Sequence, residues 1–196
     1  MTNEKKSYGD EHFIYLMDIE DNPPHENNIS DGYIIIGEEK IPFERKSILN
    51  DRISILMPEA FDIMPKEMAE IKYPSMNRAD EIYTNEETTI NLSVSHKNDA
   101  AANEDISEVK DALQEVVMRL YPASSVIDSE TIDASGVNIA YFDFSSTAID
   151  MDIYNVIFFL SLDDRLVLGS FNCPWENMDE WKPVVLQMLG SVEVNL

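Results

Sequence analysis

Positive charge is scarce in this sequence. Its 196 residues include 14 Lys and Arg against 38 Asp and Glu, which gives a formal net charge of -24 at pH 7. A surface with this excess of acids repels phosphate groups. The composition therefore argues against direct binding to nucleic acid and against docking on anionic lipid, and it favours association with a basic protein.

Cysteine and long apolar runs are also missing. Cys173 is the only cysteine, so no disulfide can form within the chain and a reducing compartment suits it. The apolar run Phe13 to Met17 is too short for the core of a signal peptide, and acids surround it. No stretch approaches the ~20 apolar residues of a membrane helix. We therefore expect a cytoplasmic protein that does not enter a membrane.

The common catalytic and metal-binding motifs are absent as well. With only six glycines, loops that cradle phosphate would be hard to build, and there is no G-x-S-x-G elbow, H-E-x-x-H, paired cysteine motif or EF-hand spacing. The three histidines, His12, His25 and His96, offer few ligands for a transition metal. We expect a protein that is not an enzyme and that has no cofactor and no metal site.

Two remaining groupings have simple structural explanations. Cys173 and His96 could in principle form a nucleophilic pair, but a free cysteine is commonly a small buried hydrophobe, and His96 continues the apolar face of a predicted strand. Asp150 and Asp152, like the acids of residues 20–26, could offer oxygen ligands to Ca²⁺. In a chain with 38 acids, neighbouring carboxylates at a solvated surface are the more ordinary interpretation.

Apolar spacing predicts an α+β domain. Val156 to Leu160 is apolar on both faces of a strand, so both faces of its sheet must be covered. The turns at residues 134–136 and 163–164 are short enough to force antiparallel pairing. We therefore expect an antiparallel β-sheet with helices packed on both faces. Strands are predicted at residues 53–57, 88–96, 125–133, 137–145, 154–162 and 165–172, short helical turns at 59–64 and 65–71, and long helices at 105–120 and 177–189.

Helix-capping residues support the two long helices. Asp105 with Glu108, and Asn177 with Glu180, have the spacing of an N-cap and the third helical position. Trp181 falls on the apolar stripe of the second helix, so we expect it in the core.

The segment before residue 46 has a different character. Residues 13–17 and 32–37 are short apolar runs joined by an acidic, Pro-containing loop, which predicts an N-terminal segment like a β-hairpin. We therefore expect an extension at residues 1–45, with an acidic loop, followed by the α+β domain at residues 46–196.

The order of elements after residue 50 resembles a known fold. A strand ends in Met57-Pro58, and Phe61 and Tyr73-Pro74-Ser75 follow it. An alternating strand, a long helix, a meander of strands and a terminal helix carrying Trp181 come next. Over residues 50–195 this order resembles the PsbP-like fold. That fold is known from extrinsic subunits of photosystem II, from a Ran-binding nuclear transport factor and from bacterial chaperones of secreted effectors. The resemblance implies protein binding without shared catalytic residues.

These observations favour a non-enzymatic interaction protein. It could be a chaperone, an immunity protein or an adaptor for a basic protein partner. The alternative is a small-molecule-binding protein or an enzyme of unrecognised class, which would need a deep pocket with convergent polar groups. Tyr73, Arg78 and Trp175 are the candidate binding residues. Tyr73 and Arg78 share one loop, and Trp175 follows Pro174 in another, where it could be an exposed anchor.

Overall fold

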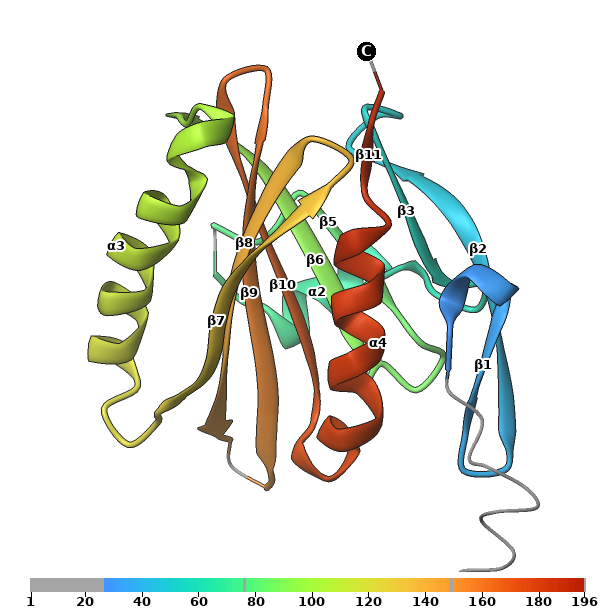
Figure 1. Cartoon of the computed structure of the whole chain (residues 1–196). Coiled ribbons are helices and arrows are strands. Elements are labelled where there is room, and N and C mark those ends of the chain that lie inside the picture. Colours follow the sequence, from blue (N-terminus) through green and yellow to red (C-terminus); the bar gives the residue numbers. More distant parts are fainter. Residues whose placement is uncertain (1–26, 76, 149, 196) are drawn as a thin grey trace, which may run out of the picture.

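The computed structural model describes residues 27–75, 77–148 and 150–195, and these residues form two antiparallel sheets (Figure 1). The large sheet has seven strands in the order β4-β5-β6-β10-β9-β8-β7, and the small sheet has four in the order β1-β2-β3-β11. The strands are β1 (Tyr33–Ile36), β2 (Glu39–Ile48), β3 (Ile53–Pro58), β4 (Asp62–Ile63), β5 (Glu81–Thr84), β6 (Asn91–Ala100), β7 (Val126–Ala134), β8 (Val137–Thr147), β9 (Asp152–Leu162), β10 (Arg165–Pro174) and β11 (Glu193–Val194).

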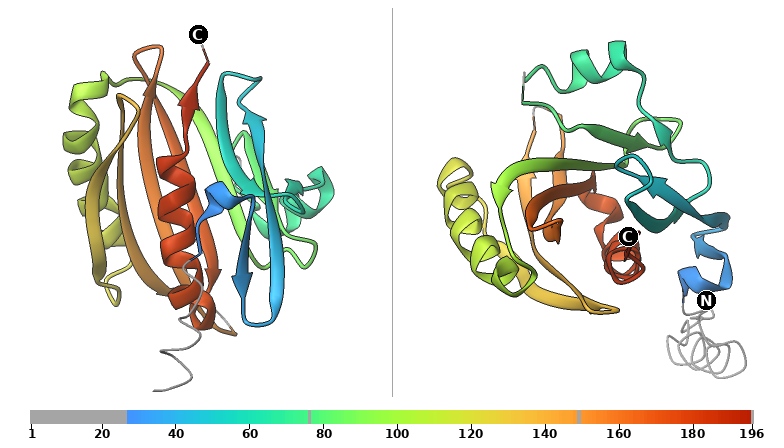
Figure 2. Two further views of the ribbon diagram at one scale, coloured as in Figure 1. Left: turned by 45° about the vertical axis from the view of Figure 1, so that its right-hand side comes forward. Right: turned by 90° about the horizontal axis from the view of Figure 1, so that it is seen from above.

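Helices cover both faces of the large sheet, as the sequence predicts. They are α2 (Lys66–Lys72), α3 (Ile106–Leu120) and α4 (Met178–Gly190), with the 3-10 turns η1 (Ile29–Asp31), η2 (Asn103–Asp105) and η3 (Trp175–Asn177). Figure 2 shows α3 outside the curved sheet, whereas α4 lies on the inner face, between the large sheet and the small one. The chain is therefore an α+β protein with a helix on each side of its main sheet.

Tight turns fix the meander of β7 to β10. Ser135 and Gly136 join β7 to β8, and Asp163 and Asp164 join β9 to β10, all with positive φ. Such turns match the right-handed twist of paired strands. The four strands predicted in this region are confirmed, with antiparallel pairing throughout.

Strand β9 is an interior strand of the large sheet, and its two faces contribute side chains to two different hydrophobic cores. Val156 and Phe158 are buried on the α4 side, whereas Phe159 is buried on the α3 side. Ile157 also faces α3 but is only half-buried. Gly169 is paired with Phe158 on the neighbouring strand β10, and the Phe158 ring occupies the space that a side chain at Gly169 would need.

Segments far apart in the sequence meet around α4. Gln187 of α4 accepts a hydrogen bond from the backbone N–H of Ile29 at 3.0 Å and donates one to the carbonyl of Asn27 at 2.9 Å. After the helix, β11 pairs with β3. The Asn195 side chain then donates to the carbonyl of Asp51 at 2.7 Å. The small sheet is thus completed by the strand that follows α4.

Several predictions about the first third of the chain need correction. Residues 33–36 form a strand, but its partner is β2, which the sequence did not predict. The predicted strand at 13–17 lies outside the described residues. Residues 59–64 form a turn and the short strand β4 instead of a helical turn. Strand β2 runs through residue 45, and the division of the chain at 45/46 stays a prediction.

The two long helices begin close to the predicted residues, but the predicted capping side chains do not cap them. Helices α3 and α4 begin one residue after Asp105 and Asn177, yet neither side chain makes a capping hydrogen bond. The turns η2 and η3 lead into the helices instead. None of the described helices combines the length and the apolar character needed to cross a bilayer.

Candidate functional site

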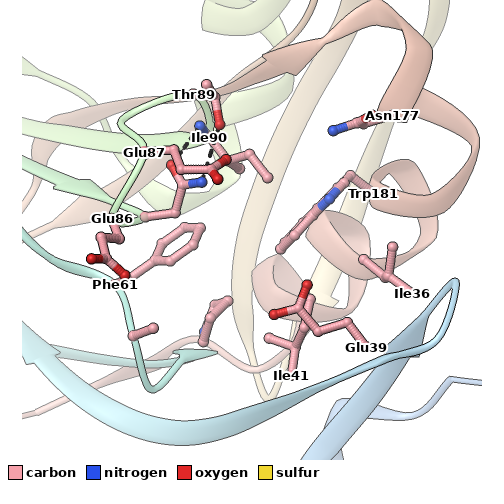
Figure 3. A pocket seen from close by; sticks show the side chains of 13 residues that line it. Ile36, Glu39, Ile41, Phe61, Glu86, Glu87, Thr89, Ile90, Asn177 and Trp181 are labelled. Atoms are coloured by element: carbon pink, nitrogen blue, oxygen red, sulfur yellow. Dashed lines mark hydrogen bonds between the residues drawn. The ribbon is translucent and has the colours of Figure 1, made fainter.

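An acidic cleft opens between the small sheet and the start of α4 (Figure 3). Its volume is about 340 Å³, within the range of small binding sites. Four parts of the fold meet there: the β1–β2 hairpin, the end of β3 with the turn that follows it, the loop between β5 and β6, and the start of α4. The lining residues are Ile36, Glu39, Ile41, Pro58, Ala60, Phe61, Asn85, Glu86, Glu87, Thr89, Ile90, Asn177 and Trp181.

Aromatic side chains form the base of this acidic cleft. The Trp181 ring stacks on Phe61 with a centroid distance of 6.2 Å and contacts Phe171 of β10 at 5.8 Å. Trp181 is almost completely buried, which confirms its prediction as a core residue. Because the rings pack against one another and the sheet behind them, the base of the cleft is rigid and apolar.

Carboxylates form the rim of the acidic cleft. Glu86 and Glu87 lie on the β5–β6 loop and Glu39 on the β1–β2 hairpin, and Figure 3 shows the loop opposite Trp181. None of the three makes an ion pair or side-chain hydrogen bond with another described residue. No Lys or Arg is among the lining residues. The rim therefore carries three uncompensated negative charges.

The β5–β6 loop that carries Glu86 and Glu87 is held by its own side chains. The Asn85 amide donates to Thr89 Oγ1 at 3.0 Å and accepts from the backbone N–H of Ile90 at 2.9 Å. Thr88 has a positive φ of 59°. Sequence reasoning missed these acids because they lie in polar connections, where the fold alone brings them beside an aromatic base. The pair Glu86-Glu87 between two strands was the available signal.

A second set of cavities forms a groove on the opposite face of the large sheet, which we call the sheet-face groove. Its central cavity has a volume of about 380 Å³ and lies between the loop after α2 and the strands β5, β6 and β10. The lining residues are Lys72, Tyr73, Pro74, Ser75, Asn77, Arg78, Ala79, Ile82, Ser93 and Ser170. A cavity of about 240 Å³ adjoins it and shares Ser93 and Ser170 with it. A third cavity, of about 430 Å³, shares Lys72 with the central one, but it is also lined by Glu87 and Asp150, and Glu87 lines the acidic cleft as well.

The sequence-derived binding residues divide between two places. Tyr73 and Arg78 both line the central cavity of the sheet-face groove, where Arg78 Nε donates to the Tyr73 carbonyl at 2.8 Å. Trp175 does not line it. It lies in η3 with 41% of its surface exposed, next to Pro174, which borders the third cavity. The roles of the three residues stay predictions, and the groove's serines and Lys72 were missed.

A buried polar cluster lies between α4 and the large sheet. Asp143 on β8 is fully buried, and its Oδ2 accepts a hydrogen bond from the Tyr154 hydroxyl at 2.6 Å and lies 2.9 Å from Lys182 Nζ. Lys182 also reaches Asp128 Oδ2 at 3.5 Å. The Asp128 carboxylate accepts from the Tyr141 hydroxyl at 3.2 Å. Asp143 Oδ1 has no hydrogen-bond partner among the described residues.

Burial and charge set the proton affinities within this cluster. Burial by itself lowers the pKa of Lys182, but hydrogen bonding to Asp143 and attraction by Asp143 and Asp128 outweigh it, so the net pKa is raised. Burial and the hydrogen bond to Asp143 raise the pKa of Tyr154 well above its usual range. The phenol therefore stays neutral, and the cluster ties α4 to β8 and β9 through a charged pair.

The thiol and imidazole considered from the sequence do not meet. His96 pairs with Val167, six residues before Cys173 on β10, which at ~3.4 Å per residue separates them by about 20 Å. His96 is half-buried on β6, and its Nε2 lies 3.1 Å from the Leu162 carbonyl. Cys173 is buried, and burial raises the pKa of its thiol to about 12. The thiol is therefore protonated and unreactive at neutral pH.

Carboxylates do not gather into a metal cage in the part of the chain that the structure describes. Asp150 precedes β9 and Asp152 begins it. Within the described ranges, no three His, Cys, Asp or Glu side chains are placed to hold one ion. His12, His25 and the whole acidic loop at 20–26 fall outside these ranges.

Comparison with known proteins shows the fold. No protein-family model and no curated protein sequence matches the chain. Among solved structures, cyanobacterial PsbP (CyanoP) from Synechocystis sp. PCC 6803 aligns with a TM-score of 0.58 and 15% identity, covering 82% of this chain and 97% of that one. The chain has a PsbP-like fold. The resemblance inferred from element order is thereby confirmed.

Two further solved structures align with this chain at low sequence identity. LpqN of Mycobacterium tuberculosis, described as involved in cell envelope biogenesis, aligns with a TM-score of 0.51 and 7% identity over 80% of this chain and 92% of that one. A Bacteroides thetaiotaomicron protein aligns with a TM-score of 0.52 and 12% identity, covering 78% of this chain and 48% of that one.

Proposed function

We propose that this protein is a non-enzymatic interaction domain that binds a basic segment of a protein partner in the acidic cleft. The observation that carries the proposal is the cleft itself, in which an aromatic base at Trp181 and Phe61 lies beneath three unpaired carboxylates. A chaperone, immunity protein or adaptor would use such a cleft. The single buried cysteine suits a reducing compartment such as the cytoplasm.

The chemistry of the cleft matches a Lys or Arg side chain of the partner. Both side chains combine an apolar stem with a charged end. The stem can lie against the apolar lining of the cleft, where Ile36 and Ile41 are partly exposed above the buried rings, while the end reaches the carboxylates of Glu39, Glu86 and Glu87. The net charge of -24 draws a basic partner toward the protein and raises the association rate.

A defined peptide provides the test. The probe is an eight-residue peptide of alternating Arg and Leu, and the readout is the fluorescence of Trp181 in a Trp175→Phe background, which leaves Trp181 as the only tryptophan. We expect saturable binding that weakens as salt rises from low to physiological ionic strength, where the Debye length is about 8 Å. A peptide with Glu in place of Arg should not bind.

Matched triple variants separate the cleft from net charge. Glu39→Gln/Glu86→Gln/Glu87→Gln removes three carboxylates from the rim and should weaken binding roughly tenfold, as three partly exposed ion pairs would. Glu104→Gln/Asp105→Asn/Glu108→Gln removes the same charge at the start of α3, beyond the large sheet, and should change affinity less than about twofold. Equal losses in both variants, or no peptide binding at low salt, would refute the proposal.

A further inference from the structure

Unpaired positive charge is concentrated in the sheet-face groove. Of the twelve Lys and Arg in the described residues, five have no carboxylate partner there, namely Lys40, Lys72, Arg78, Lys97 and Arg165. Two of these five, Lys72 and Arg78, line the central cavity, and Lys97 lines the adjoining cavity that shares Ser93 and Ser170 with it. The central cavity has no acid in its lining. In a protein with a net charge of -24, a cavity with this lining suits an anion.

Arg78 is positioned to receive that anion. Its Nε donates to the Tyr73 carbonyl at 2.8 Å, which fixes one edge of the guanidinium plane. Its two terminal nitrogens make no hydrogen bond to any described residue, and the side chain is half-buried. A guanidinium held at Nε presents two parallel N–H donors, the geometry that matches the two oxygens of a carboxylate.

Hydroxyl groups line the floor of the central cavity. Ser93 on β6 is paired with Ser170 on β10, and their Oγ atoms lie 2.8 Å apart. One hydroxyl donates to the other, so one O–H and several lone pairs remain for a ligand. Burial raises the pKa of Tyr73, whose hydroxyl is near Asn172, so this group also stays a neutral donor. Groups of this kind recognise the hydroxyls of a ligand.

We propose that the central cavity of the sheet-face groove is a binding site for a small hydroxylated carboxylate, a molecule of the sugar-acid class. The carboxylate lies on the free edge of Arg78, Lys72 adds positive potential, and the ligand hydroxyls contact Ser93 and Ser170. The volume of about 380 Å³ accommodates a ligand the size of a monosaccharide. The central cavity lies on the opposite face of the large sheet from the acidic cleft and shares no lining residue with it, so this site is independent of the proposed function.

Titration of the full ¹⁵N-labelled chain tests the site with three probes: D-glucuronate, D-glucose and inorganic phosphate. With D-glucuronate we expect saturable shifts of the Arg78 Nε–Hε signal and of the Ser93 and Ser170 amides. D-Glucose lacks the carboxylate and should bind roughly tenfold more weakly or worse. Absence of saturable shifts up to roughly 50 mM D-glucuronate would overturn the proposal, and tighter binding of phosphate than of glucuronate would overturn the assignment to a carboxylate.

Substitutions of Arg78 test whether glucuronate binds in the central cavity. Arg78→Gln should weaken glucuronate binding at least about tenfold. Arg78→Lys keeps the charge and lacks the paired donors, so it should also bind more weakly, and it guards against a folding defect in the first variant. The control is Arg165→Gln, which removes a cation that hydrogen-bonds Asn98 and lines no part of the groove. Wild-type affinity in both Arg78 variants would refute the site.

Discussion

Replacing Lys182 by Met should reveal how much the buried polar cluster stabilises the fold. The substitution keeps an unbranched side chain of similar length and removes its charge. Asp143 is fully buried, and Lys182 Nζ at 2.9 Å is its only cationic partner among the described residues. In the variant, the Asp143 carboxylate would keep only its hydrogen bond from Tyr154.

The free energy of unfolding that the variant loses depends on whether the Asp143 carboxylate stays charged. Leaving a buried charge without its partner costs about 3 to 5 kcal/mol. The carboxyl can take up a proton instead. For a carboxyl with an ordinary pKa of ~3.9, that costs about 5 kcal/mol at pH 7.5 and about 2 kcal/mol at pH 5.5. The variant should therefore lose 3 to 5 kcal/mol at pH 7.5, and no more than about 2 kcal/mol at pH 5.5.

The wild type should not share this dependence on pH. The pKa of Lys182 is raised in the folded chain, so the stability it contributes is fully present below its ordinary value of 10.5 and is lost as the pH rises through the raised value. Between pH 5.5 and 7.5 that contribution is constant. The whole difference between the two pH values therefore comes from proton uptake in the variant.

Urea unfolding followed by tryptophan fluorescence at the two pH values measures these free energies. The control is Lys66→Met, which removes an exposed lysine 4.0 Å from Glu70 and should cost about 0.5 kcal/mol or less at either pH. The reasoning fails if Lys182→Met costs less than about 1 kcal/mol at pH 7.5, or if its cost is the same at both.

Two further predictions concern the core. Phe158→Ala should lower the free energy of unfolding by about 3 to 5 kcal/mol, because the ring is buried on the inner face of β9, and a loss in urea unfolding below about 1 kcal/mol would contradict the interior position of that strand. Cys173 should react with a chromogenic disulfide reagent only after unfolding, because its thiol is buried and burial raises its pKa to about 12. The labelling rate of the native protein at pH 8 is compared with that of the urea-unfolded protein. Rapid labelling of the native protein would contradict the prediction.

Local sequence signals were sufficient for the second half of the chain. Strands β7 to β10 are consecutive and joined by short turns, so their pairing follows from their order. One face of β2 is exposed, so only Phe43 and Ile48 of this strand are buried. Its sequence therefore has the polar character of a loop. Strand β5 has four residues, too few for its alternation to stand out. Both strands exist because the neighbouring strands supply their hydrogen-bond partners.

The candidate sites depend on contacts that the sequence does not display. Tyr73 and Arg78 could be chosen together because they share one loop, but Ser93 and Ser170 become neighbours only through the β6–β10 pairing. The Asp143–Lys182 pair joins β8 to α4. Its one local signal is a carboxylate within the apolar run Tyr141 to Phe144, which marks a buried charge in need of a partner.

The position of α4 between the two sheets has a consequence for the order of folding. Strands β7 to β10 can pair with neighbours in sequence, whereas the small sheet gains β11 only after α4 has been made. The contacts that close this region join residues 144 and 158 positions apart. Contacts between residues so far apart in sequence form late in folding, because closing the long loop between them costs conformational entropy. The base of the acidic cleft, which contains Trp181, should therefore be among the last parts of the molecule to assemble, so the meander of β7 to β10 can form before the cleft exists.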